Sequence, residues 1–315
     1  MPVRDPIQRV PDDVTAAPQG RVAADRLGQI GVWSGRLHRI AINEASELAA
    51  EWEELGYGAI WIPEPPAGRD VLSFAAVLLG RTKKIVAATG IAVIWNRDPT
   101  AMVNSGRTLQ EAHPGRFVLG IGVSHRNSVQ GRGGQYETPA TAMREYLESM
   151  RRARYDGFPP GTQAPLVVAA LGPRMTRLGA ELADGVHPFL TNPVHTDATR
   201  QVLGDDPLLA VEQAVILSRS KEKAREAARE NLARYLEWEN YRRHLIRIGF
   251  TEDDLESGGS DRLIDGIYAW GDEADVERRV SEHFDAGADH VCLQIVPVEG
   301  ADEPESLRLL ASALL

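Results

Sequence analysis

The amino-acid sequence predicts an α/β fold, specifically a (β/α)8 TIM barrel, from two patterns and the chain length. From residue 28 onward, short apolar runs of strand length alternate with longer segments of helical periodicity. Eight strand runs can be counted, each followed by a helical segment. Strands that alternate with helices pair in parallel through right-handed crossovers, and eight such units can close into a barrel. The length of 315 residues suits one such domain. A doubly wound open sheet is the alternative.

The predicted elements follow one another in regular order. The strands cover residues 29–33, 56–64, 84–94, 116–123, 165–171, 185–190, 208–217 and 290–297. The helices cover residues 43–55, 69–80, 99–112, 139–154, 173–183, 195–203, 219–237, 273–286 and 303–314. Pro99 stands at the first turn of its helix, and the sequence His113-Pro114-Gly115 cannot continue that helix.

Two regions depart from this alternation. Residues 1–27 are rich in Pro, Asp and Arg, and we predict a loosely ordered N-terminal arm there. Residues 238–262 mix aromatic and arginine residues with a Gly-Gly-Ser turn, which indicates an insertion near the seventh strand. The barrel domain is therefore expected to span residues 28–315.

Composition excludes several classes of function. The net charge of −10 gives no electrostatic footprint for nucleic acid and no basic face for an anionic membrane. The chain has one cysteine, Cys292, and its histidines show no metal-binding spacing, so we predict no disulfide and no metal site. No secretory signal and no apolar run of membrane-spanning length occurs, which favours a cytoplasmic protein that acts on a small molecule.

In a barrel, chemistry gathers on the loops that follow the strands. The fifth strand ends in Leu171-Gly172-Pro173-Arg174-Met175. Glycine allows close backbone approach, proline presets the first helical turn, and the next amides point outward at the positive end of the helix dipole. This turn predicts a phosphate site to which Arg174 adds a charged hydrogen bond. An ordinary strand–helix turn with a solvated arginine is equally compatible.

Glycines mark two further strand ends. Gly120 and Gly122 alternate on the fourth strand before Val123, Ser124 and His125, which leaves one face open to a flat ring or a phosphate tail. Close packing of neighbouring strands is the alternative reading. In the third strand, Thr89-Gly90-Ile91 places a glycine inside an apolar run, which indicates a bulge, a ligand contact or a barrel corner.

Several side chains at strand ends are candidates for catalysis. His125 and His195 follow strands and are either proton donors, phosphate ligands or structural residues. Glu64 ends the second strand, where a carboxylate can act as a base, hold a ring nitrogen or cap the next helix. Trp33 ends the first strand and either walls a ring or fills the core. The remaining residues of interest have structural readings: core packing for His187, helix ends or helix surfaces for His113, His244 and His283, and a small buried hydrophobe for Cys292.

Three stretches, in this order, resemble the bacterial luciferase-like superfamily of flavin- and deazaflavin-dependent oxidoreductases. They are residues 88–125, 171–189 and 286–297. Within this superfamily, the Gly-Pro-Arg-Met turn and the Gly-Val-Ser-His ending are most similar to the actinobacterial branch that uses coenzyme F420. The resemblance implies a barrel with an insertion near the seventh strand, a cofactor across the strand ends and a homodimer. It also implies a non-prolyl cis peptide at Gly90–Ile91.

The resemblance also implies roles for particular residues. The bulge at Gly90–Ile91 would back the cofactor ring, residues 122–124 would line the cofactor, and residues 172–175 would hold its phosphate. Trp33, Glu64 and His125 would face the ring or the substrate. The expected reaction is hydride transfer between F420 and a small organic substrate. An FMN-dependent monooxygenase is the first alternative, and a non-catalytic flavin-binding protein is the second. Ser124-His125 departs from the glycine that often follows the family's Gly-Val pair.

Overall fold

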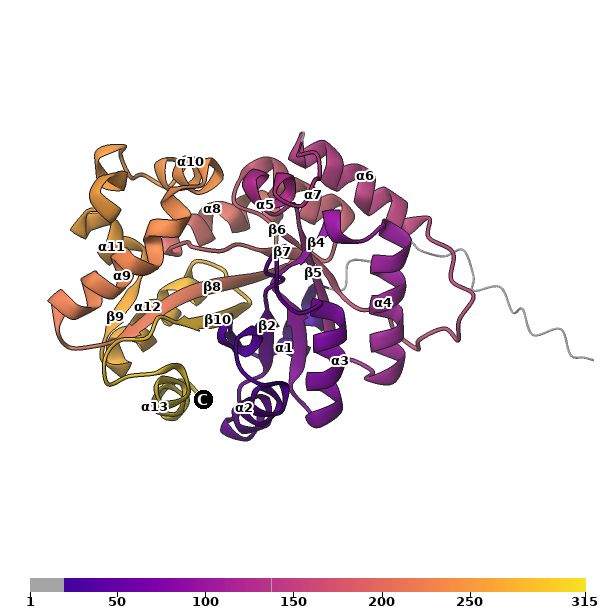
Figure 1. Cartoon of the computed structure of the whole chain (residues 1–315), viewed down its shortest axis with the longest axis horizontal. Helices are drawn as coiled ribbons and strands as arrows, with labels where there is room; N and C mark the ends of the chain where they lie inside the picture. Colours follow the sequence, from indigo (N-terminus) through magenta and orange to yellow (C-terminus); the bar gives the residue numbers. More distant parts are fainter. Residues whose placement is uncertain (1–19, 137) are drawn as a thin grey trace, which may run out of the picture.

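The computed structural model describes residues 20–136 and 138–315. In this part of the chain, eight parallel strands pair as a closed ring (Figure 1). In ring order they are β1 (Ile30–Trp33), β2 (Ala59–Ile62), β3 (Val86–Thr89), β5 (Phe117–Gly122), β6 (Leu166–Ala169), β7 (Gly185–His187), β8 (Leu208–Leu217) and β10 (His290–Ile295). β10 pairs with both β8 and β1, which closes the barrel. The predicted (β/α)8 TIM barrel is confirmed.

Helices cover the outside of this barrel. They are α2 (Ile42–Leu55), α3 (Val71–Arg81), α4 (Pro99–Ala112), α6 (Pro139–Arg151), α7 (Pro173–Leu182), α8 (Pro193–Leu203), α12 (Glu273–Asp285) and α13 (Glu303–Leu314). Local sequence explains several of their ends. Asp98 accepts hydrogen bonds from two amides of the first turn of α4, and Pro99 opens that helix as predicted. The same helix ends at His113, also as predicted.

Aromatic and imidazole rings fill the barrel interior. The indole of Trp61 on β2 donates to Nε2 of His290 at 3.0 Å and stacks on the ring of His187 at 4.3 Å. His187 is 2% exposed, so its predicted place in the core is confirmed. Nδ1 of His290 donates to the Gly28 carbonyl and Nδ1 of His187 donates to the Ala210 carbonyl, so these hydrogen bonds fix the orientation of both rings.

The helix α1 (Gly20–Leu27) corrects the predicted N-terminal arm. The sequence suggested a loose segment through residue 27, but residues 20–27 form a helix that packs against β8. Ala23 and Leu27 are fully buried among the residues that fill the barrel. The contact between α1 and β8 could not be predicted from the polar composition of this segment, because only a few apolar residues of α1 form it. Residues 1–19 lie outside the described part of the chain.

The predicted third strand is divided at a cis peptide. β3 ends at Thr89, the peptide bond between Gly90 and Ile91 is cis, and the chain resumes as β4 (Ala92–Val93), which pairs with β5. The expected non-prolyl cis bond is therefore present at the expected position. Three short helical segments accompany the strand exits: η1 (Arg36–His38), η2 (Ile94–Asn96) and α5 (Arg126–Gln130).

A large excursion leaves the barrel between β8 and α12. It consists of α9 (Lys221–Leu236), α10 (Glu239–Arg247), η3 (Asp253–Gly258), α11 (Asp261–Ile267) and β9 (Ala269–Gly271). Its orange helices gather on one side of the molecule in Figure 1. The excursion has an apolar core of its own, which includes Leu232, Leu245 and Leu263. β9 adds to β8 in parallel. The predicted insertion, residues 238–262, lies inside this longer excursion, and α12 serves as the barrel helix before β10.

Candidate active site

The cis peptide lies among large rings at the ends of β1, β3 and β7. The indole of Trp33 donates to the carbonyl oxygen of Gly90 at 3.0 Å. A Cβ on Gly90 would lie only 2.9 Å from that indole nitrogen and 3.3 Å from Nε2 of His187. Glycine is therefore required here for close approach. Trp33 is 8% exposed and its ring lies 5.1 Å from that of Phe189, so the predicted wall residue is packed against β7's exit.

The glycine at position 120 serves strand packing. A Cβ there would lie 1.9 Å from the carbonyl oxygen of Thr89. The Thr89 hydroxyl donates to the Gly120 carbonyl at 2.7 Å and accepts from the Gly120 amide at 2.8 Å. Thr89 and Gly120 are both buried, and Thr89 directly precedes the bulge at Gly90–Ile91. Gly120 therefore fits the alternative of close packing between neighbouring strands. Gly122 faces Ile91, because a Cβ on Gly122 would lie 2.7 Å from that side chain.

A cavity of about 170 Å³ opens beside the bulge. Its lining brings together the exits of β2, β4 and β5, and includes Glu64, Trp95, Ser124 and Arg132. The Trp95 indole donates to the Val123 carbonyl at 2.7 Å and so ties η2 to the β5 exit. Of the site residues predicted from the sequence, Glu64 and Ser124 therefore share one cavity wall.

Glu64 is committed to a buried ion pair. Its carboxylate accepts from the Val93 amide at 2.7 Å and from both terminal nitrogens of Arg97, at 2.7 and 3.0 Å. Asp70, which pairs with the same guanidinium, caps α3 in place of Glu64. Glu64 thus fixes the segment after the cis peptide; proton transfer by this residue stays a prediction.

We expect Glu64→Gln to lower the free energy of unfolding by about 1–3 kcal/mol, because it leaves Arg97 without its buried counterion. The Glu64 side chain is 5% exposed, whereas Asp70 is 47% exposed. Asp70→Asn is therefore the control, and its effect should be under about 1 kcal/mol. Urea unfolding measures both. Equal losses for the two variants would contradict the role assigned to Glu64.

His125 joins the β5 exit to the excursion. Its Nδ1 donates to the side-chain oxygen of Asn240 at 3.2 Å, and its ring stacks on Trp238 at 4.0 Å. This contact leaves Nε2 as the atom that can exchange a proton. Burial lowers the pKa of His125, so the ring is neutral near pH 7. The turn at Ser124 before it has φ of +56°.

The exit of β6 forms an uncapped helix start. Gly172 is the N-cap of α7, no side chain of the described residues caps it, and Pro173 follows. Arg174 is exposed, and Leu171 and Met175 are half-buried. A Cβ on Gly172 would lie 3.3 Å from a guanidinium nitrogen of Arg247 in α10. The positive end of α7 and two arginines thus meet at one turn.

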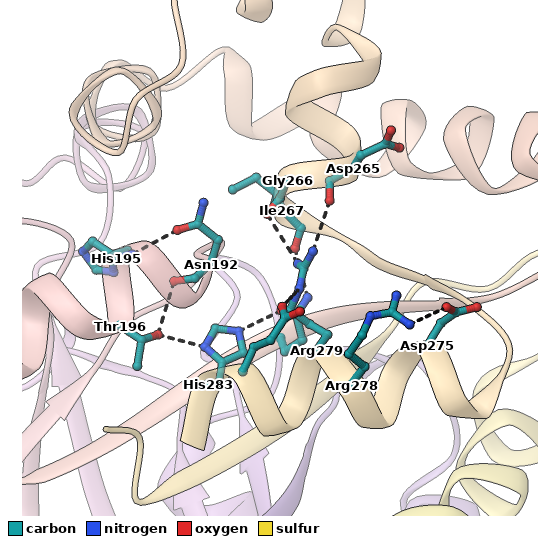
Figure 2. Close-up of polar contacts among 12 residues, drawn as sticks. Asn192, His195, Thr196, Asp265, Gly266, Ile267, Asp275, Arg278, Arg279 and His283 are labelled. Atoms are coloured by element: carbon teal, nitrogen blue, oxygen red, sulfur yellow. Dashed lines mark hydrogen bonds and ion pairs between the residues drawn. The ribbon is translucent and has the colours of Figure 1, made fainter. Parts of the chain in front are cut away.

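Two donors approach the carbonyl of Leu171. They are Arg247 at 3.0 Å and His195 at 3.3 Å. Nδ1 of His244 lies 3.2 Å from the same oxygen without donating, because the single N–H of this neutral ring is on Nε2 and donates to the Leu190 carbonyl. Arg247 is not among the site residues predicted from the sequence. The cluster of arginines in residues 238–262 is the feature that could have indicated it. His195 is buried in α8 and its main-chain amide bonds to Asn192, so it has a structural role beneath the turn (Figure 2).

Two histidines expected at helix ends or helix surfaces are buried. His244 and His283 lie in the last turns of α10 and α12, which confirms the helix-end prediction, but both are 0% exposed, so the alternative of a helix surface is wrong. His283 bonds to the Thr196 hydroxyl at 2.8 Å (Figure 2). Its Nε2 donates to the side-chain oxygen of Gln213 at 2.9 Å. The helix face that each residue occupies is decided by contacts between α10, α12 and the barrel, which local sequence does not reveal. Cys292 is buried, as predicted.

Two further findings concern metals and membranes. Among residues 20–136 and 138–315, no group of three or more histidine, cysteine or acidic side chains is arranged to hold a metal ion. No helix in the same residues has the length and apolar character needed to cross a membrane.

Comparison with known proteins decides the family. The model of the luciferase-like monooxygenase family matches residues 21–290. The chain belongs to this family. A 5,10-methylenetetrahydromethanopterin reductase from Archaeoglobus fulgidus is 27% identical over 308 residues, which cover 84% of this chain and 92% of that protein. This luciferase-like chain is an oxidoreductase, as the relatives in its family are.

Solved structures share the fold at lower identity. An F420-dependent secondary alcohol dehydrogenase, in complex with an F420–acetone adduct, matches 91% of this luciferase-like chain and 98% of its own, with a TM-score of 0.72 and 17% identity. A type II Baeyer–Villiger monooxygenase from Pseudomonas putida, in complex with FMN, matches 91% of this chain and 98% of its own, with a TM-score of 0.63 and 18% identity. The same barrel therefore occurs with either cofactor.

Proposed function

We propose that this chain is an F420-dependent oxidoreductase that transfers a hydride between coenzyme F420 and a small organic substrate. The observation that carries the proposal is the turn at residues 171–175, where an uncapped helix start meets Arg174 and Arg247. This turn follows β6, and β5 separates β6 from β3 and β4, which flank the glycine-bearing bulge. A flat ring joined to a phosphate matches these two features. The F420–acetone adduct held by a protein of the same fold supports a deazaflavin.

The phosphate would be held by the first turn of α7. The free amide of Arg174 and its guanidinium supply donors, and Gly172 lets the main chain approach. The ring would lie on Gly90–Ile91 and residues 122–124, with Trp33 as its wall. When bound, the deazaflavin supplies the hydride chemistry. The surrounding aromatic side chains exclude water from the ring.

His125 is the proposed proton-transfer residue. Its Nδ1–H is engaged by Asn240, so Nε2 of the neutral ring is the base that accepts a proton when the substrate is oxidised and returns it when the substrate is reduced. Glu64 is less suited, because Val93 and Arg97 occupy its carboxylate. We assign Glu64 to positioning of the bulge.

Arg174→Gln is expected to weaken cofactor binding by about tenfold, because one charge-assisted hydrogen bond to a phosphate is lost. Arg177→Gln is the matched control, since Arg177 is exposed one turn further along α7. Fluorescence titration of the cofactor measures both dissociation constants. If the two variants bind equally well, the turn at residues 171–175 is not the phosphate site.

The FMN-dependent monooxygenase is the second candidate, favoured by the FMN complex of the same barrel. Titration of the purified protein with oxidised F420 and, separately, with FMN distinguishes the two. We expect saturable F420 binding and weaker FMN binding. Tight FMN binding without F420 binding would refute the first proposal. A non-catalytic flavin-binding protein would bind F420 but give no change in F420 absorbance with any small alcohol, ketone or imine offered as substrate.

A further inference from the structure

A buried carboxyl group on β8 lies outside the residues considered so far. Glu212 is 0% exposed, and its Oε2 accepts from the Leu190 amide at 2.8 Å. Its Oε1 has no hydrogen-bond partner among the described residues. Burial raises the pKa of Glu212 to about 8, so the group is a neutral acid near pH 7, with Oε2 as the acceptor and the proton on Oε1.

The Leu190 peptide is held from both sides. Its amide donates to Glu212, and its carbonyl accepts from Nε2 of His244 at 3.1 Å. Leu190 has φ of +53°, a left-handed conformation that a leucine seldom adopts without support. The turn after β7 therefore depends on these two hydrogen bonds.

This turn leads directly to the proposed ring site. Phe189 precedes Leu190, and its ring lies 5.1 Å from Trp33 and 5.6 Å from Tyr235. Trp33 in turn donates to the carbonyl of Gly90, the first residue of the cis peptide. An unbroken series of contacts thus connects Glu212 with the bulge.

We propose that Glu212 is a positioning residue: as a carboxylic acid it fixes the Leu190 turn and so holds Phe189 and Trp33 as the wall of the cofactor site. The identity of the bound ring rests on the function proposed above, whereas the role of Glu212 in fixing the Leu190 turn does not. The acid form is the working form, because a carboxylate at this depth would have no counterion within hydrogen-bond distance among the described residues.

Other titratable groups around Glu212 belong to α9, α10, β10 and the segment between α11 and β9. Burial raises the pKa of each of these hydroxyl and thiol groups, so they are neutral: Tyr235, Tyr241, Tyr268 and Cys292. Arg234 is the nearby cation, and its guanidinium donates to the Tyr235 hydroxyl at 2.6 Å. The folded-state pKa of Glu212, about 8, lies above the unfolded value of 4.5. Its contribution to stability therefore falls as the pH rises from about 4.5 to 8 and levels off above 8, where the folded group is itself ionised.

The test compares Glu212→Gln, which keeps the acceptor but cannot ionise, with Glu212→Met, which removes the acceptor. Glu226→Gln, an exposed change on α9, is the control. In the cofactor-free protein at pH 6.5, Glu212→Met should speed hydrogen exchange of the Leu190 amide by about tenfold or more, while Glu212→Gln stays within about twofold of the natural protein. F420 affinity, measured by fluorescence titration, should fall by about tenfold for Glu212→Met alone.

Raising the pH distinguishes a positioning role of Glu212 from a role in packing alone. At pH 9 the natural protein should exchange the Leu190 amide faster than Glu212→Gln at the same pH, and should bind F420 more weakly. Unchanged exchange in Glu212→Met, or identical pH profiles for the natural protein and Glu212→Gln, would overturn the proposal. If Glu212→Met does not fold, the pH comparison still decides. If the natural protein binds no F420, the proposed function fails while the exchange measurements still test Glu212.

Discussion

Acidification from pH 7 to pH 5 is expected to remove several kcal/mol of stability from this protein. Five histidines are buried, and burial lowers the pKa of His187, His195 and His290 to about 4 and of His244 and His283 to about 3. In the unfolded chain each has the ordinary pKa of 6.5. The unfolded state therefore binds more protons below pH 6.5, and stability falls as the pH falls toward 4.

The expected loss of stability is large because the contributions of the five histidines add. Each contributes about 1–2 kcal/mol of loss at pH 5, against a total stability of about 5–15 kcal/mol for a typical domain. Urea unfolding across pH 5 to 8 measures the dependence. His283→Gln removes one of the five ionisations, and should reduce the slope by about 1.4 kcal/mol per pH unit at most. A stability that stays flat between pH 7 and pH 5 would contradict neutral, buried histidines.

Gly120→Ala should cost at least about 3 kcal/mol of stability, or prevent folding, because the added Cβ would lie 1.9 Å from the main-chain oxygen of Thr89. That oxygen belongs to β3 and cannot move without breaking the paired hydrogen bonds between Thr89 and Gly120. Any surviving protein should bind cofactor poorly, since the bulge at Gly90 follows directly.

Gly80→Ala is the matched control for this substitution. Gly80 lies in α3, and a Cβ there meets nothing within 4 Å. Alanine in a helix should stabilise the protein by about 0.5–1 kcal/mol. Thermal unfolding of the two variants compares them directly. A Gly120→Ala protein as stable as Gly80→Ala would show that β3 and β5 do not approach as closely as described.

Much of the barrel could be predicted because its strands are continuous apolar runs, and Pro99 and His113 mark helix ends chemically. The excursion was harder to delimit, because β9 spans only Ala269–Gly271 and gives no periodic signal. The contact of α1 with the barrel depends on residues far away in the sequence. Long-range packing, not local pattern, decides such elements.

The site was predictable in part for a similar reason. Glycines at 90, 120 and 122 and the turn at 171–175 are visible in the sequence because unusual residues occupy strand ends. Glu212 lies inside the apolar run Leu208–Leu217, so the sequence predicts it only as part of a strand and not as a site residue. Arg247 reaches the turn at residue 172 only because α10 folds back over α7's start. Neither placement follows from spacing in the sequence.

The central claim, that the barrel mouth holds a deazaflavin, is tested most directly by a crystal structure of the protein grown with oxidised F420. We expect the ring to lie against Gly90–Ile91 and the phosphate to lie at the start of α7, within hydrogen-bond distance of the Arg174 amide. A phosphate bound elsewhere, or a ring that does not contact the bulge, would contradict it.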